Sequence, residues 1–170
     1  MRTPKTNRDR IRSLCQAAVI AALYTVLTCV VGAFGLANGA IQLRLSEALC
    51  ILPLFTPAAI PGLTLGCLIS NLITGCLPTD VVFGTLATLL GAVGARLLRR
   101  FPYLSPLPTA LSNTLIIPFI LAYAYHAEEG LPFLFLSVGI GELISAYLLG
   151  IILYLSIYKH SDHLFGQSKQ

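Results

Sequence analysis

Apolar runs long enough to cross a lipid bilayer recur along most of the chain, and they limit its possible folds more than any other feature. The clearest lie at residues 13–36, 81–98, 106–125 and 132–157. A hydrocarbon core of ~30 Å takes roughly 20 helical residues to cross. Since backbone groups in lipid must bond to one another, helices are favoured. With 56% hydrophobic and 11% charged residues, the 170-residue chain is predicted to be an all-α, polytopic membrane protein.

Residues 46–77 form a further apolar stretch, which three prolines and Gly62 interrupt. Proline breaks a helix interior, so this stretch is predicted to form two short helices packed as a hairpin. The first run is too long for the hydrophobic region of a signal peptide and is predicted to be a retained helix. The chain is therefore expected to be one integral membrane domain, with a basic tail at 1–12, a six-helix bundle at 13–157 and a second tail at 158–170.

Basic residues predict the orientation of this bundle, because they favour the cytoplasmic side of a membrane. Six crossings place both termini on one side, and ten of the eleven basic residues fall there: Arg2, Lys5, Arg8, Arg10, Arg12, Arg96, Arg99, Arg100, Lys159 and Lys169. Arg44 is the exception, and the same topology places it outside, together with Asp80, Glu128 and Glu129. Both termini are predicted to be cytoplasmic, and the net charge of +4 indicates topology, not a nucleic-acid surface.

No catalytic or metal-binding motif accompanies the spans. The sequence has no phosphate-binding loop, nucleophile elbow or zinc-protease signature. Its five cysteines include no C-x-x-C pair and have no histidine at ligand spacing, so they are interpreted as packing residues and no metal is expected. The chain is expected not to be an enzyme, and any ATP chemistry would belong to a partner.

Polar groups inside or beside the spans mark the candidate site, because burying them in a membrane requires partners. Glu142 lies about ten residues inside the last span, or ~15 Å by helical rise. An acid at this depth indicates either a functional site or a hydrogen bond between helices. Asn71 and Asn113 leave the same two alternatives open.

Arg44 and Glu47 stand three residues apart in IQLRLSEALC. They could form a surface ion pair, worth only a few tenths of a kcal/mol. Alternatively, since Arg44 breaks the pattern of basic residues, something on the outer side uses it. Asp80, at the outer start of the span at 81–98, is interpreted as a helix cap in preference to a ligand group.

Small residues at four-residue spacing predict close packing of helices. One row of such residues lies in the second half of 46–77, and another lies in the last span. The first span carries two alanine pairs, shifted by one residue relative to each other, which could dock another protein or a helix of this chain. These residues are Gly62, Gly66 and Ser70; Ser137, Gly141 and Ser145; and Ala17 with Ala21 and Ala18 with Ala22.

Four stretches closely resemble the QueT family: IQLRLSEALCILPLFTPAAIPGLTLGCLISNLITG, DVVFGTLATLLGA, a fifth span carrying Asn113, and GELISAYLLG. The resemblance covers about residues 10–158 and is strongest from Gln42 to Leu90. Members of this family are substrate-binding S components of energy-coupling factor (ECF) transporters, assigned to the uptake of queuosine precursors.

This resemblance implies a mechanism. S components look like six-helix bundles that bind a vitamin-like ligand towards the outer side. Small residues of the first helix dock them onto a transmembrane coupling protein with two cytoplasmic ATPases, and ATP hydrolysis makes the S component topple and deliver its ligand inward. Here the docking motif is matched by Ala17, Ala18, Ala21 and Ala22. No cofactor of its own and a bacterial plasma-membrane location are expected.

Queuosine precursors such as preQ0, preQ1 and queuine are 7-deazaguanines, so their site needs a carboxylate that accepts two hydrogen bonds and a donor for the lactam oxygen. Glu142 is predicted to face the base with Asn71 beside it, while Arg44 and Glu47 lie at the outer entrance. Glu47 stays open as the alternative carboxylate, and Asn113 as a further donor. The flat ring also needs apolar or aromatic walls, for which the candidates are Phe83, Phe119, Tyr123 and Tyr147.

Two other functions stay open. An S component for a flavin, a pterin or another vitamin would need only a few different side chains. A stand-alone secondary carrier is less favoured, because such carriers often show internal repeats and ion-coupling acids at the midplane. The sequence shows no clear repeat, and Glu142 is its one deep acid.

Overall fold

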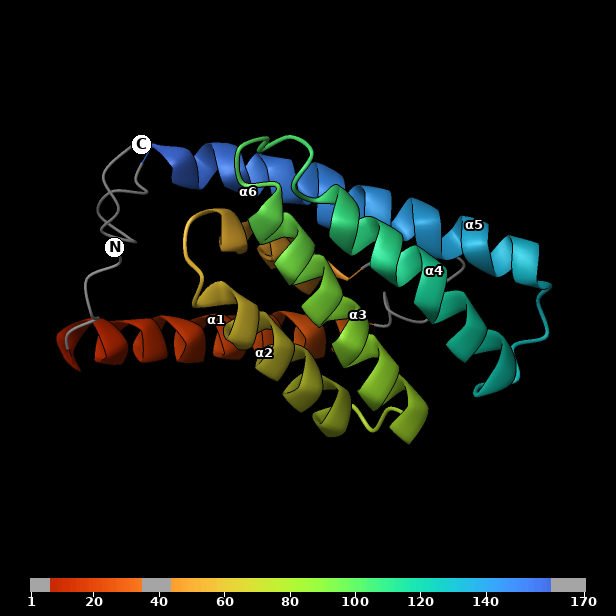
Figure 1. Cartoon of the computed structure of the whole chain (residues 1–170). Helices are drawn as coiled ribbons and strands as arrows, with labels where there is room; N and C mark the ends of the chain where they lie inside the picture. Colours follow the sequence, from red (N-terminus) through yellow and green to blue (C-terminus); the bar gives the residue numbers. More distant parts are fainter. Residues whose placement is uncertain (1–6, 35–43, 160–170) are drawn as a thin grey trace.

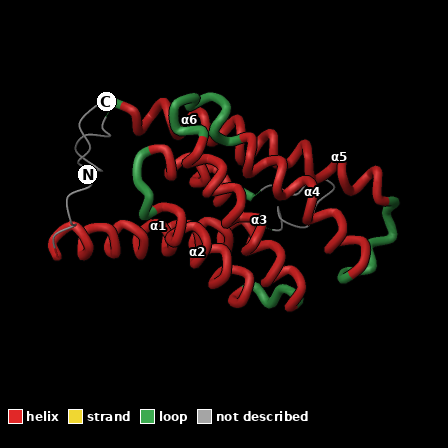
Figure 2. The backbone as a smooth tube through the Cα atoms, in the orientation of Figure 1, coloured by secondary structure: helices red, strands yellow, loops and turns green. Residues whose placement is uncertain are grey.

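The computed structural model describes residues 7–34 and 44–159, which form a bundle of helices with no strand among them (Figures 1 and 2). The last helix is continuous over Leu131–Tyr158 but contains a π-helical turn, η2, and the 3₁₀ helix η1 precedes α2. The elements are α1 (Asn7–Ala33), η1 (Leu45–Leu54), α2 (Ala59–Ile73), α3 (Pro78–Leu97), α4 (Leu107–Tyr123), α5 (Leu131–Glu142), η2 (Leu143–Leu148) and α6 (Leu149–Tyr158).

Each predicted segment has a helical counterpart, and the all-helical prediction is confirmed. The stretch at 46–77 does divide into two short helices, η1 and α2. α1, α3 and the joined Leu131–Tyr158 helix are long and apolar enough to cross a membrane, whereas η1, α2 and α4 are shorter apolar helices. Arg2, Lys5, Lys169, the end of the predicted first span, half of the first tail and most of the second lie outside the described residues.

Prolines explain where three of the helices begin. α3, α4 and α5 each carry a proline in the first turn: Pro78, Pro108 and Pro132. Proline fits there because the first backbone N–H groups of a helix have no partner within the helix. Gly75 adopts a φ of 71° between α2 and α3, a conformation that glycine reaches without strain.

The 3₁₀ helix η1 lies in the middle of the bundle. It contacts α1, α2, α3, η2 and α6, and most of its residues are buried. At its C-terminal end, Arg96 of α3 donates from Nη1 to the carbonyl oxygens of Pro53 and Leu54, at 2.8 and 3.1 Å. These bonds satisfy carbonyls that a helix end leaves without partners. Arg96, predicted only as a topology signal, thus also fixes the central segment.

Helices α1 and α2 pack with their backbones almost in contact. A Cβ added to Gly62 would lie 2.8 Å from the carbonyl oxygen of Ala17, and one added to Gly66 would lie 2.9 Å from that of Ala21. The close packing predicted for this glycine row is therefore confirmed, and its partner is the Ala17–Ala21 pair within the same chain. The offset pair, Ala18 and Ala22, is exposed on α1.

Many small and polar residues are buried in the bundle beside its apolar core, and many large apolar residues are exposed. Buried positions include Thr88, Ala92 and Ala95 of α3, whereas Leu86 and Leu155 are exposed. This arrangement is typical of helices surrounded by lipid, where small residues allow close contact and apolar side chains face the bilayer.

α1, α2 and α4 run in one direction along the bundle, and α3 and the joined Leu131–Tyr158 helix run in the opposite direction, as Figure 1 shows. The start of α1 and the end of α6 lie at one end of the bundle, on the left of that view. The C-terminal ends of α1, α2 and α4 and the N-terminal ends of α3 and α5 point towards the other end.

Candidate functional site

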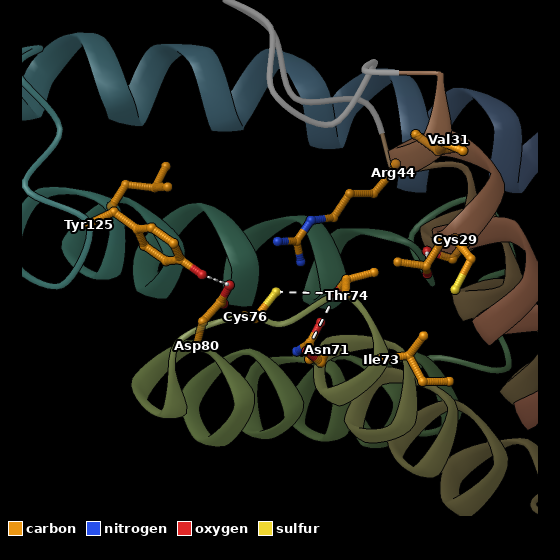
Figure 3. A pocket seen from close by; sticks show the side chains of 14 residues that line it. Cys29, Val31, Arg44, Asn71, Ile73, Thr74, Cys76, Asp80 and Tyr125 are labelled. Atoms are coloured by element: carbon orange, nitrogen blue, oxygen red, sulfur yellow. Dashed lines mark hydrogen bonds between the residues drawn. The ribbon is translucent and has the colours of Figure 1, made fainter.

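A cavity of about 650 Å³ is lined by residues at the C-terminal end of α1 and in the first turn of α3 (Figure 3). These helix ends lie at the end of the bundle away from the start of α1 (Figure 1). The volume of the cavity falls in the range of roughly 300–1,000 Å³ common for small-molecule sites. The lining comes from the ends of α1, α2 and α4, from the residues around the start of η1, and from the first turn of α3. Its main polar side chains are Arg44, Asn71, Asp80 and Tyr125.

Asp80 is the acidic group of this cavity and is 6% exposed. Its Oδ2 accepts a hydrogen bond from the hydroxyl of Tyr125 at 3.2 Å. Its Oδ1 is buried and has no hydrogen-bond partner among the described residues. The prediction that Asp80 caps α3 is wrong, because Leu77 occupies the N-cap position and Asp80 lies within the first turn. There, its charge is favoured by the helix dipole.

Arg44 is the cation of the cavity. It precedes η1 in a non-helical conformation, with φ −120° and ψ 88°, and its backbone N–H donates to Oγ of Ser145 at 3.1 Å. The guanidinium extends into the cavity (Figure 3). Burial alone would lower the pKa of Arg44, but the negative charge of Asp80 contributes most to a net rise above its usual value. Arg44 therefore remains a cation.

Asn71 brings an amide to the same wall as Asp80. Its Nδ2 makes a long hydrogen bond to Sγ of Cys67, at 3.6 Å. A Cβ added to Gly84 would lie 3.1 Å from Oδ1 of Asp80 and 3.3 Å from Nδ2 of Asn71. Both polar groups thus lie close together over the backbone of Gly84, where an added side chain would be crowded.

Tyr125 lies just beyond the end of α4 and connects two elements of the cavity. Its hydroxyl donates to Asp80 and accepts a hydrogen bond from the N–H of Leu77 at 3.1 Å. Burial raises the pKa of Tyr125 to about 12, so the hydroxyl keeps its proton at neutral pH. Nothing in the residue pattern pointed to Tyr125, since aromatic side chains also occur in many loops at a membrane surface.

Glu47 differs from both of its predicted positions, since it neither lies at an entrance nor pairs with Arg44. It is fully buried and does not line the cavity. Its Oε1 accepts a hydrogen bond from the hydroxyl of Tyr24 at 2.6 Å, and its Oε2 accepts one from Sγ of Cys50 at 3.2 Å. Glu47 therefore links α1 to the central segment η1.

Glu142 and Asn113 lie together, outside the lining of the cavity. Glu142 ends α5 at the start of the π-helical turn, where residues of functional sites often occur, and it is 5% exposed. Its Oε1 accepts a hydrogen bond from Nδ2 of Asn113 at 3.0 Å, whereas Oε2 has no partner within the described part of the chain. The structure thus contains the bond between helices that the sequence left open as an alternative.

The four aromatic candidates do not line this cavity. Phe83 faces outward at 48% exposure. Phe119 and Tyr123 stack on each other on α4, with ring centroids 6.4 Å apart, and Tyr147 lies half-buried in η2. The aromatic ring in the cavity belongs to Tyr125, and its apolar walls come from Val31, Ile73 and Leu121.

Apolar outer surfaces, a small-residue interior and a polar cavity at one end define a helical membrane protein with room for a small molecule. The model of the QueT transporter family matches residues 14–159, and the chain therefore belongs to that family. This confirms the resemblance found in the sequence.

One curated relative is the queuosine precursor transporter QueT of Lactococcus lactis subsp. cremoris (strain MG1363). It is 39% identical to this chain over 64 residues, which cover 38% of this chain and 38% of that protein. The similarity therefore spans well under half of the relative. No solved structure matches the chain.

Proposed function

We propose that this chain is the substrate-binding S component of an ECF importer for a queuosine precursor, a 7-deazaguanine such as preQ0, preQ1 or queuine. The family match over residues 14–159 carries this proposal. The substrate named for the relative from Lactococcus lactis supports it, as does a cavity of suitable size that contains both an acid and a cation.

All six helical segments cross the membrane in this proposal, and both termini are cytoplasmic. The exposed Arg99 and Arg100 follow α3 at the end of the bundle away from the cavity, where the rule for basic residues places the cytoplasm. η1, α2 and α4 have only 10–17 residues, fewer than a full membrane crossing takes. In this proposal the loops at their ends complete the path to the two membrane surfaces. The cavity then opens to the outside of the bacterial plasma membrane.

The ligand lies in the cavity, with its ring against Val31, Ile73 and Leu121. Arg44 and Asn71, both predicted as ligand contacts, line this space. Glu47, Asn113 and Glu142 do not contact the ligand in this proposal. They hold the surrounding helices together through their hydrogen bonds.

Docking onto the coupling protein uses the exposed alanine pair of α1. Ala17 and Ala21 are covered by α2, whereas Ala18 and Ala22 are exposed and allow another helix to approach closely. The partner ATPases supply the ATP chemistry, and this chain binds its ligand without a cofactor and catalyses no reaction.

Isothermal titration of the purified, detergent-solubilised chain tests the proposal. We expect saturable binding of at least one of preQ0, preQ1 and queuine, and weaker or no binding of riboflavin and folate. Binding of riboflavin or folate alone would contradict the proposed substrate. If folded protein binds none of these ligands, the same titrations on the complex with its coupling module must show deazaguanine binding, or the proposal is wrong.

A further inference from the structure

One carboxylate oxygen of a side chain that lines the cavity has no partner among the described residues. Asp80 uses Oδ2 for Tyr125, which leaves the buried Oδ1 without a hydrogen bond among the described residues. A buried charged group in this condition is unfavourable until a donor reaches it. Because Asp80 lines the cavity, a ligand there can supply that donor.

Oδ1 lies beside the backbone of Gly84 and near the amide of Asn71. Gly84 has no side chain, and a Cβ at that position would lie 3.1 Å from Oδ1 of Asp80 and 3.3 Å from Nδ2 of Asn71. The guanidinium of Arg44 enters the same space from the residue before η1 (Figure 3). An acceptor, an amide and a cationic donor are therefore presented together.

The other buried carboxylates do not match this arrangement. Both oxygens of Glu47 already accept hydrogen bonds, from Tyr24 and Cys50. Glu142 also has an oxygen without a partner in the described residues, but it does not line the cavity. Of the three, Asp80 alone both lines the cavity and has an oxygen without a partner among the described residues.

We infer that Asp80 is the carboxylate that recognises the base, by accepting hydrogen bonds from its N1–H and 2-amino groups, while Arg44 donates to the lactam oxygen. This inference rests on the proposed function, since it assigns the residues that read a guanine-like edge. A carboxylate accepts from two parallel N–H groups, and the guanidinium of arginine is a fixed donor for an oxygen.

The assignment determines which rings are excluded. A 2-deamino analogue loses one of the two donors that face Asp80. A 7-deazaadenine ring presents an acceptor at N1 to the carboxylate and an amino group to Arg44, so both contacts become unfavourable. Sites built to bind a polar group strongly reject analogues that lack it.

The test combines changes in the protein with changes in the ligand. Affinities of preQ0 and preQ1 and of their 2-deamino analogues are measured for the wild type, for Asp80→Asn, which keeps the volume and an acceptor for Tyr125, and for Glu128→Gln. Glu128 is exposed in the loop after α4, so its variant controls for loss of one negative charge. Thermal unfolding of each variant in detergent reports whether it is folded.

We expect Asp80→Asn to weaken binding of the deazaguanines on the order of 100-fold, and Glu128→Gln to change it less than about threefold. Loss of the 2-amino group should weaken wild-type binding about tenfold or more, and this penalty should largely disappear in Asp80→Asn. The coupling between the two changes identifies a direct contact, which a merely structural role would not produce.

Three outcomes would overturn the inference. Unchanged deazaguanine affinity in folded Asp80→Asn would do so and leave the proposed function intact. If Asp80→Asn fails to fold, equal wild-type affinities for the deazaguanines and their 2-deamino analogues would have the same effect. If the wild type, alone and with its coupling module, binds no deazaguanine, the proposed function and this inference both fail.

Discussion

The hydroxyl of Tyr24 donates a hydrogen bond to Oε1 of Glu47 at 2.6 Å, joining α1 to η1 at a fully buried carboxylate. One turn further along α1, Oγ1 of Thr28 donates to Oγ of Ser46 at 2.9 Å. Thr28 and Ser46 both line the cavity. The hydrogen bonds between α1 and η1 therefore hold together the two helices that form one side of the cavity.

Replacing Tyr24 with Phe should destabilise the chain by about 1.5–3 kcal/mol, because a buried carboxylate loses one of its two donors. The midpoint of thermal unfolding in detergent would report this loss. Tyr103→Phe is the matched control, since Tyr103 is exposed and loses the same atom. Equal shifts in the two variants would show that the bond to Glu47 contributes little.

Replacing Gly66 with Ala should destabilise the packing of α1 on α2 by about 1–3 kcal/mol. The new Cβ would lie 2.7 Å from Cβ of Tyr24 and 2.9 Å from the carbonyl oxygen of Ala21. Gly139→Ala is the control, because its Cβ would meet Thr114 at an ordinary 3.5 Å and alanine favours the helix. Thermal unfolding should rank Gly66→Ala below the wild type and Gly139→Ala at or above it.

The pair formed by Asn113 and Glu142 can be tested with a double-mutant cycle. Asn113→Leu should destabilise the chain by about 1–3 kcal/mol, because it leaves the buried carboxylate of Glu142 without its donor. Adding Glu142→Leu should recover much of this loss, since replacing both partners with apolar groups leaves no buried polar group without a partner. Unfolding midpoints of the two single variants and the double variant measure the coupling. Simple additivity would contradict the contact.

The two alanine pairs of α1 should respond differently to bulky residues. Ala17→Leu with Ala21→Leu should unfold the chain or abolish ligand binding, because these side chains face the backbone of α2. Ala18→Leu with Ala22→Leu should leave binding unchanged and stop uptake by cells, since that pair is exposed. Titration of the purified variants and an uptake assay separate the two effects. Normal uptake by the second variant would place the docking surface elsewhere.

The sequence predicts the segments well but places the site less well. In a soluble protein an apolar residue indicates the core, whereas in lipid the apolar face of a helix can point outward. For this reason Phe83, interpreted as a wall of the site, faces outward on α3 instead. Small residues were the more reliable signal, and they correctly identified Gly62 and Gly66 as a packing surface.

The position of Arg44 shows a second reason why the sequence predicts the site less well than the helical segments. A spacing of three residues predicts a pair with Glu47 only if both residues are helical. η1 begins at Leu45, so the non-helical Arg44 sends its side chain into the cavity while Glu47 turns towards Tyr24. The interpretation of Asp80 as a cap failed for a similar reason, because the span was predicted to begin at residue 81, whereas α3 begins at Pro78 and contains Asp80 in its first turn.

The π-helical turn at Leu143–Leu148 gives the last helix two different registers. A π turn widens the helix by about one residue relative to an α-helical turn, so the residues after it are rotated by about 100° relative to an uninterrupted helix. Glu142 before the turn and Gly150 after it are both buried, whereas in an uninterrupted α-helix two residues eight apart would differ in direction by about 80°. Removing one residue from the turn would bring the whole helix into a single register. Glu142 and Gly150 would then lie seven residues, or about two α-helical turns, apart, so both could stay buried on the inner face.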